Sequence, residues 1–153
     1  HRHFRRQRQM CIRDRARARA ASMHHPPRFI GCSLQQLFDS DLLNTVDLIV
    51  SNSLLHHLHD PDLLWSLTSR LAVQGCRVLH RDLRRPFSLS ELDRLQRKYL
   101  SEAPSVLIQD FRASLAAAFE PDEVKSQLKR AGLTSLSVEA EDDRYLVVSG
   151  LVD

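Results

Sequence analysis

With 153 residues and 17.6 kDa, the chain is long enough for one domain with a hydrophobic core and too short for two ordinary ones. Its 42% hydrophobic and 27% charged residues are typical of a globular protein, and no apolar run approaches the roughly 20 residues that span a bilayer. The start of the chain lacks the apolar segment of a secretory signal, and Cys11, Cys32 and Cys76 form no CxxC pair. We therefore expect a cytoplasmic protein with reduced thiols, without a membrane contact or a zinc knuckle.

The positive charge is confined to the start of the chain. Residues 1–20 hold eight of the 22 basic residues and one acid, Asp14, whereas the remainder holds 14 basic and 18 acidic residues. Residues 1–27 show no hydrophobic periodicity, so we predict that they are disordered. The run Arg8–Arg15 resembles translated sequencing-adaptor sequence, which would make this segment an artefact; the alternative is an arginine-rich arm for RNA, DNA or anionic lipid. Because the rest of the chain is acidic, nucleic acid is not the expected partner.

The remainder, residues 28–153, alternates between strand and helix patterns. Strands are predicted at Arg28–Ser33, Val46–Val50, Arg77–His80, Leu133–Glu139 and Arg144–Ser149. Helices are predicted from Asp60-Pro61 to Gln74-Gly75, from Ser88 to Tyr99, from Pro104 to Phe119, and from Glu120-Pro121 to Gly132. This order indicates an α/β fold with a parallel sheet whose faces are covered, and the last two strands add an antiparallel edge.

One stretch, Val46–Pro61, runs from a buried strand through small polar residues and a His-His pair to the start of a helix. In open α/β sheets, ligands bind outside the carboxyl ends of the strands. We therefore expect chemistry at Ser51 to His57. The spacing of His56, His57 and His59 does not bring the three rings together, so no metal site is predicted.

Four motifs resemble class I S-adenosylmethionine-dependent methyltransferases. Asp47–Leu58 with Asp60-Pro61 is similar to their fourth strand, Arg77–Leu83 to the fifth strand with its terminal aspartate, Phe119–Leu133 to the helix before the sixth strand, and Arg144–Val148 to the seventh. The resemblance implies a Rossmann-like sheet with strands in the order 3-4-5-7-6, flanking helices and an antiparallel last strand. It also implies S-adenosylmethionine as the cofactor. Because the body of the chain is acidic, we expect the methyl acceptor to be a small molecule and not a nucleic acid.

The same comparison indicates that the chain is the C-terminal half of such a domain. The family binds the cofactor with a glycine-rich turn after its first strand, but Gly31, Gly75, Gly132 and Gly150 are the only glycines here, and they form no GxG. We therefore expect this chain to be inactive alone, with an uncovered sheet edge and a tendency to aggregate. The alternative is a degenerate, non-catalytic module that binds a protein or RNA partner.

The resemblance implies roles for individual residues. Cofactor contacts fall on Cys32 and Ser33 near the adenine, and on Ser51, Asn52, Ser53 and Leu54 beneath the methionine portion. The residues that face the methyl-transfer cleft are His57 and His56, and a histidine there can serve as a general base or merely bind a loop carbonyl. Substrate contacts fall on Asp82, Arg84, Phe111 and Arg112, although Asp82 can equally be a solvated acid at a strand end.

Overall fold

The computed structural model describes residues 14–153, and the chain falls into two compact units, His1–Ser33 and Leu34–Asp153. In the first unit, residues 14–20 are helical, and residues 26–33 have no regular structure. The predicted division of the chain at residues 27 and 28 stays a prediction. Residues 1–13, with Cys11 and much of the arginine-rich segment, lie outside the described residues, and the artefact interpretation stays a prediction.

The strand predicted at Arg28–Ser33 is wrong. None of its residues joins a sheet, and Ile30 is 47% exposed. An extended segment becomes a strand only when a neighbouring strand accepts and donates its backbone hydrogen bonds, and among the described residues none does so here. The sheet therefore begins at the next predicted strand.

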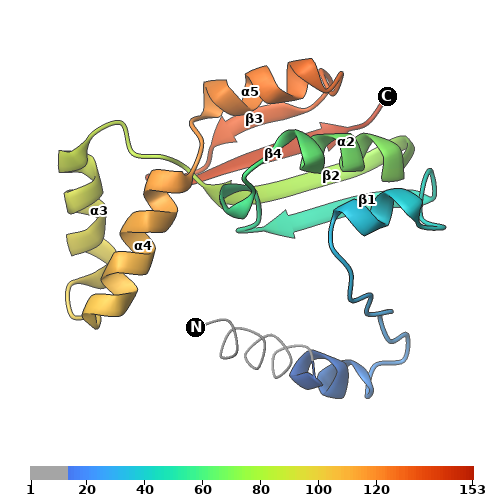
Figure 1. Cartoon of the computed structure of the whole chain (residues 1–153), viewed down its shortest axis with the longest axis horizontal. Coiled ribbons are helices and arrows are strands. Elements are labelled where there is room, and N and C mark those ends of the chain that lie inside the picture. The colour runs from blue at the N-terminus through green and yellow to red at the C-terminus, as the bar shows by residue number, and fades with distance from the viewer. Residues whose placement is uncertain (1–13) are drawn as a thin grey trace. The chain divides into compact units, whose positions relative to one another are not determined.

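The second unit is built on a four-stranded sheet in the order β1-β2-β4-β3 (Figure 1). Strands β1 (Val46–Asn52) and β2 (Ala72–Leu83) are parallel, whereas β4 (Tyr145–Leu151) runs antiparallel to β2 and to β3 (Ser137–Ala140). The predicted mixed α/β fold and its antiparallel terminal hairpin are confirmed. The carboxyl ends of β1 and β2 lie at the same edge of the sheet, as the parallel pairing requires.

Helix α2 (Asp62–Leu71) joins the two parallel strands and begins after Pro61. The predicted end of this helix at Gln74-Gly75 is wrong, because the helix stops at Leu71 and β2 starts at once. Gly75 lies within β2 with a φ of 79°, where a residue without a side chain is favoured, and the pairing with β1 shifts its register beside it. A bulge thus occupies the place where the sequence indicates a helix end.

The other helical elements are η1 (Gln35–Asp39), η2 (Leu55–His57), α3 (Leu89–Leu100), α4 (Ser105–Ala117) and α5 (Pro121–Arg130). Helix α3 starts as predicted, with Ser88 Oγ accepting the N–H of Glu91 at 3.1 Å. Figure 1 shows α3 and α4 as a helical pair beyond the carboxyl end of β2, and this pair has a small core of its own. No helix of residues 14–153 is long and apolar enough to cross a bilayer.

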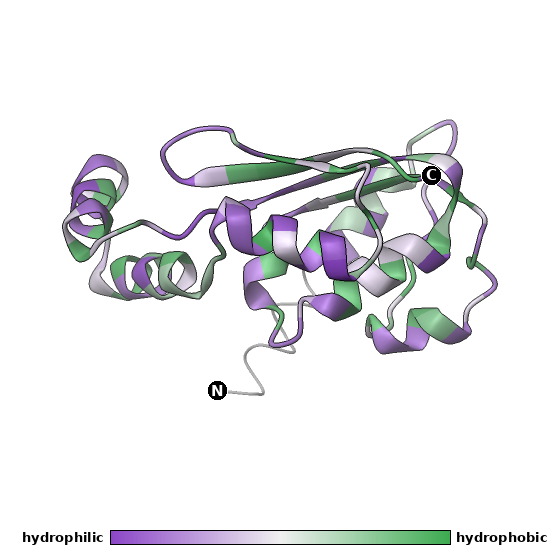
Figure 2. Ribbon diagram, turned by 90° about the horizontal axis from the view of Figure 1, so that it is seen from above, coloured by the Kyte–Doolittle hydropathy of each residue, from purple (hydrophilic) through white to green (hydrophobic). Residues whose placement is uncertain are grey.

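The two faces of the sheet differ in their environment. Figure 2 shows helices α2 and α5 on one side of the strands. On that side Trp65 of α2 is fully buried, and its Nε1 donates to Gln127 Oε1 of α5 at 2.8 Å. Along each strand, side chains that point toward these helices alternate with side chains that point to the opposite face. Four large apolar side chains of that face are exposed: Leu48, Val50, Leu79 and Leu151.

Candidate functional site

Asp82, at the carboxyl end of β2, is only 1% exposed. Its carboxylate accepts the backbone N–H groups of Leu54 and Leu55 at 2.6 Å each and that of Leu83 at 2.8 Å. Burial has the largest single effect on the pKa of Asp82 and raises it, but the hydrogen bond and charge of His56 and these N–H donors hold the pKa below its usual value. An ionised carboxylate therefore fixes the loop that follows β1 to the end of β2.

His56 is the side-chain partner of this carboxylate. Its Nδ1 lies 2.5 Å from Asp82 Oδ1, and the ring is almost fully buried. Nδ1 therefore donates to the carboxylate, which fixes the orientation of the ring and leaves Nε2 as its second nitrogen. Among the described residues, nothing forms a hydrogen bond with Nε2. A carboxylate that orients an imidazole in this way is the arrangement that prepares a histidine for general-base catalysis.

His57 is exposed beside it, with the two ring centroids 3.9 Å apart and the rings tilted by 42°. Partial burial and then the charge of His56 lower the pKa of His57, and the charge of Asp82 opposes them. His57 is therefore neutral near pH 7 and can accept a proton from a molecule at the surface. The structure thus brings the two histidines of the predicted site together on the short helix η2.

His80 lies two residues before Asp82 on β2, so both side chains are on the same face of the sheet, and both are buried. Its Nδ1 is 2.7 Å from Ser51 Oγ, and its Nε2 is 3.5 Å from Thr68 Oγ1. The Thr68 hydroxyl donates to the carbonyl of Leu64 at 2.9 Å, so it accepts from Nε2, and the Ser51 hydroxyl donates to Nδ1. Burial lowers the pKa of His80 to about 4, against the charge of Asp82. His80 is therefore a neutral, fixed acceptor that orients Ser51.

The four loop residues predicted to contact a cofactor are held in different ways. Ser51 donates to His80, and Leu54 gives its backbone N–H to Asp82. Ser53 has a φ of 54°, a left-handed conformation that is uncommon for serine and found at constrained loops. Asn52 is exposed, and its side chain forms no hydrogen bond within residues 14–153. Asn52 is therefore a loop side chain that is available to a ligand.

The alternative prediction, that Asp82 is a solvated acid at a strand end, is wrong, because its carboxylate is buried beneath the loop. Protein donors also surround its oxygens, so the geometry favours a loop anchor over a direct substrate contact. Arg84, just beyond β2, donates from Nη2 to the carbonyl of Asp142 at 3.1 Å. The predicted role of Arg84 in substrate binding stays a prediction.

The remaining two predicted substrate residues lie on α4. Arg112 Nη1 is 2.6 Å from Asp93 Oδ1 and 2.7 Å from Gln96 Oε1, so it links α4 to α3. Phe111 is half-buried against the core of the same helical pair. Both side chains therefore hold the two helices together in this structure, and their predicted contact with a substrate has no support from the geometry.

Two other predictions concern metal and adenine. Cys32 and Ser33 belong to the unit His1–Ser33, so their contact with an adenine stays a prediction. Over residues 14–153, no group of three His, Cys, Asp or Glu side chains is arranged to hold a metal ion.

Sequence reasoning missed His80. The signal was available in the alternation of β2, where Cys76, Val78, His80 and Asp82 occupy every second position and therefore share the buried face. A polar residue on a buried strand face needs hydrogen-bond partners. The register of β1 and β2 places Ser51 opposite His80 and so supplies one.

Comparison with solved structures identifies the fold. The chain is similar to an arsenic(III) S-adenosylmethionine methyltransferase from Chlamydomonas reinhardtii, with 17% identity, a TM-score of 0.56, and coverage of 83% of this chain and 44% of that one. It is also similar to an O-methyltransferase family protein from Burkholderia thailandensis, with 15% identity, a TM-score of 0.52, and coverage of 84% and 36%. A third structure, from Bordetella parapertussis and described as a possible exported protein, has 19% identity, a TM-score of 0.54, and coverage of 76% and 42%.

These likenesses show that the chain has the fold of S-adenosylmethionine-dependent methyltransferases. It spans less than half the length of each of these three structures. No protein-family model matches the sequence, and no curated protein matches it. The likeness is therefore one of fold.

Proposed function

We propose that this chain is the C-terminal part of a class I S-adenosylmethionine-dependent methyltransferase domain that acts on a small molecule. The main observation in support is the position of the loop after β1. Asp82 fixes this loop at the carboxyl edge of the parallel strands, with His56 and His57 beside it. That edge is where open α/β sheets bind ligands. The order β1-β2-β4-β3, with β4 antiparallel, supports a correspondence with strands 4, 5, 7 and 6 of the family.

The residues present suit part of the cofactor. Asn52 offers an uncommitted amide at the end of β1, and Ser51 keeps lone pairs on a hydroxyl whose proton is held by His80. These groups can bind the polar methionine end of S-adenosylmethionine, which supplies an activated methyl group when bound. The glycine-rich turn that would approach the rest of the cofactor is not in this sequence.

The histidines supply the proton chemistry of the proposal. His56 keeps Nε2 free because Asp82 holds Nδ1, and His57 is neutral and exposed. Either ring can remove a proton from a hydroxyl or carbon nucleophile of the acceptor, and a general base of this kind contributes about 10²- to 10⁴-fold to a rate. Asp82 acts through His56 and through the loop, as a positioning residue.

The exposed apolar face of the sheet supports the view that further protein covers it. Leu48, Val50, Leu79 and Leu151 are exposed apolar side chains on one face of the sheet, which a complete domain of this kind would bury beneath helices. On this proposal, the chain alone does not complete a methyl transfer.

Calorimetry with S-adenosylmethionine tests the proposal on this chain and on a version extended upstream to a complete reading frame. Binding by the extended version and not by this chain is expected. If neither version binds, the methyltransferase proposal fails, and the fold alone remains.

The same exposed face favours a second candidate, a non-catalytic module that binds a protein partner. Contiguous exposed apolar side chains mark interaction sites in many proteins. Binding of S-adenosylmethionine by the extended chain in calorimetry would argue against this candidate. A stable complex with a protein partner, without cofactor binding, would favour it.

A further inference from the structure

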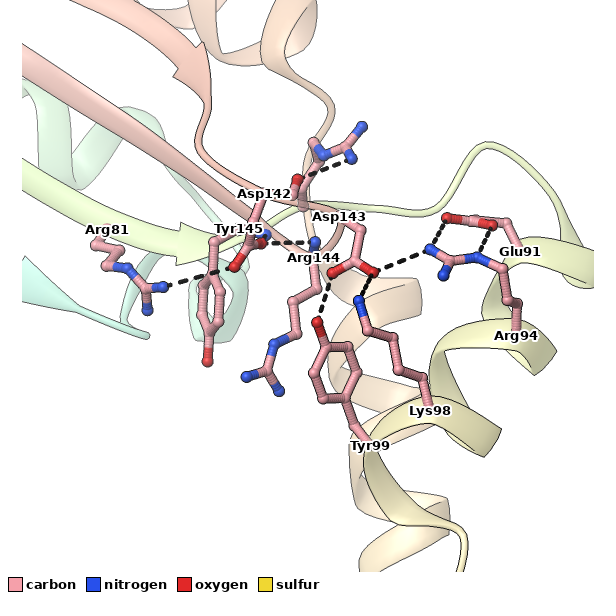
Figure 3. Close-up of polar contacts among 10 residues, drawn as sticks. Arg81, Glu91, Arg94, Lys98, Tyr99, Asp142, Asp143, Arg144 and Tyr145 are labelled. Carbon is pink, nitrogen blue, oxygen red and sulfur yellow. Dashed lines mark hydrogen bonds and ion pairs between the residues drawn. The ribbon is translucent and has the colours of Figure 1, made fainter.

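A cluster of charged and aromatic side chains surrounds the turn between β3 and β4 (Figure 3). Its labelled members come from the end of β2, from α3, from the turn and from the first residue of β4: Arg81, Glu91, Arg94, Lys98, Tyr99, Asp142, Asp143, Arg144 and Tyr145. Tyr145 pairs with Leu83, so the cluster lies at the edge of the sheet that also carries Asp82. No part of the site described above uses these side chains.

Arg144 is the guanidinium of this cluster that lacks an anionic partner. Its central carbon lies 3.8 Å from the centroid of the Tyr99 ring and 4.9 Å from that of Tyr145. Its Nε is buried without a hydrogen-bond acceptor, and no carboxylate of residues 14–153 forms an ion pair with it. Buried donors in proteins are nearly always satisfied, so this guanidinium is unusually poor in partners. Its two Nη groups are not buried and have no hydrogen-bond partner within residues 14–153, so they remain for an acceptor from outside the chain.

Asp143, the nearest acid in sequence, is fully engaged elsewhere. Its Oδ2 lies 2.7 Å from Lys98 Nζ and 3.1 Å from Arg94 Nη2, and its Oδ1 accepts the hydroxyl of Tyr99 at 2.7 Å. The last contact also fixes the Tyr99 ring on which Arg144 lies. Figure 3 shows these three contacts and no contact from Asp143 to the Arg144 guanidinium.

The other two acids of the turn are engaged as well. Asp142 Oδ1 accepts the backbone N–H groups of Arg144 and Tyr145 at 2.8 and 2.7 Å. Glu141 pairs with Arg81 at 2.6 Å, and the Arg81 guanidinium lies 3.5 Å from the centroid of the Tyr145 ring. Both tyrosine rings are therefore held in place around Arg144.

We propose that Arg144 binds the carboxylate or phosphate group of a small molecule. A guanidinium held against aromatic rings loses little freedom on binding, and its planar N–H groups match two oxygens of an oxyanion. The further step, that this anion belongs to the methyl acceptor, rests on the proposed function. The binding of an anion does not.

Tyrosine NMR reports directly on this site, because Tyr99 and Tyr145 are the only two tyrosines of the chain. The full chain, labelled with ¹³C in its tyrosine rings, is titrated with inorganic phosphate, with benzoate, and with the neutral analogue benzamide. Saturable shifts of the ring signals are expected with phosphate and benzoate in the millimolar range, and none with benzamide. Arg144→Gln should weaken benzoate binding at least about tenfold, because the charge-assisted pair of hydrogen bonds is lost.

Arg97→Gln is the matched control, since it removes an exposed charge from α3 and should leave the titration unchanged. Equal shifts with benzoate and benzamide, no shift at about 50 mM phosphate, or unchanged binding by Arg144→Gln would each overturn the proposal. If Arg144→Gln does not fold, the comparison of benzoate with benzamide on the unaltered chain decides whether the site binds an anion. A failure of cofactor binding in calorimetry leaves these signals unaffected, so the two proposals fail separately.

Discussion

Asp82 and Asp143 lie at the same edge of the sheet, and each collects several donors. Asp82 is buried and holds backbone N–H groups of the loop after β1, whereas the side chain of Asp143 is 21% exposed and holds Lys98, Arg94 and Tyr99. Hydrogen bonds from these donors lower the pKa of both carboxyls, and burial opposes them most strongly at Asp82. The comparison indicates that a buried anion can fix the conformation of a backbone loop, whereas a partly exposed anion joins side chains whose charges water screens.

The largest expected effect comes from Asp82→Asn. The amide cannot accept from all of the N–H groups that the carboxylate holds, and His56 loses its charged partner. Removing one member of a buried pair costs about 3 kcal/mol or more in the free energy of unfolding. Urea denaturation followed by circular dichroism measures it, and a loss below about 1 kcal/mol would show that Asp82 does not fix the loop.

A second effect of similar size is the acid sensitivity caused by His80. The pKa of His80 is about 4 in the folded chain and near 6.5 when unfolded, so the unfolded state binds more protons between these values. The free energy of unfolding should therefore fall by about 3 kcal/mol as the pH drops from 6.5 to 4.

The matched variant is His80→Gln, which keeps hydrogen-bonding groups without a titration in this range. Its unfolding should lose most of that dependence, and the lowered pKa values of Asp82 and Asp143 should add a further loss below about pH 4. A wild-type curve that is flat from pH 6.5 to 4 would contradict the burial of His80.

The two faces of the sheet give a smaller contrast. Val148 is fully buried and Val50 is 63% exposed, so the same change to threonine tests both faces. Val148→Thr should cost about 1–3 kcal/mol by burying a hydroxyl, and Val50→Thr less than about 0.5 kcal/mol. Light scattering should also show less aggregation for Val50→Thr. Equal losses of stability would mean that both faces are covered.

The smallest expected effect is that of Asp143→Asn. Its partners lie at the surface, so the loss in the free energy of unfolding should stay below about 1 kcal/mol and shrink further in 1 M salt. Urea denaturation at low and high salt measures both values. A loss as large as that of Asp82→Asn would remove the distinction between the two aspartates.

Much of the fold followed from local patterns. The start of α3 at Ser88, the start of α5 at Pro121 and the terminal hairpin were predicted because caps, prolines and alternation are written in neighbouring residues. The end of α2 and the strand at Arg28–Ser33 were not, because a bulge at Gly75 and the absence of a pairing partner depend on the rest of the sheet.

The site was predictable in place and less so in detail. The His56-His57 pair and the strand-end Asp82 were both selected from the sequence, but their hydrogen bond joins residues 26 positions apart. The stacking of Arg144 on Tyr99 is equally remote in sequence, and no short motif marks it. Contacts of this range need the register of the strands before they can be named.

The most direct test of the central claim is calorimetric titration of S-adenosylmethionine into the chain extended upstream to a complete reading frame, alongside its Asp82→Asn and Asp143→Asn versions. We predict binding by the extended chain, unchanged affinity for Asp143→Asn, and at least about tenfold weaker affinity for Asp82→Asn, because only Asp82 holds the loop that carries Ser51 to His57. No binding by the extended chain would contradict the account.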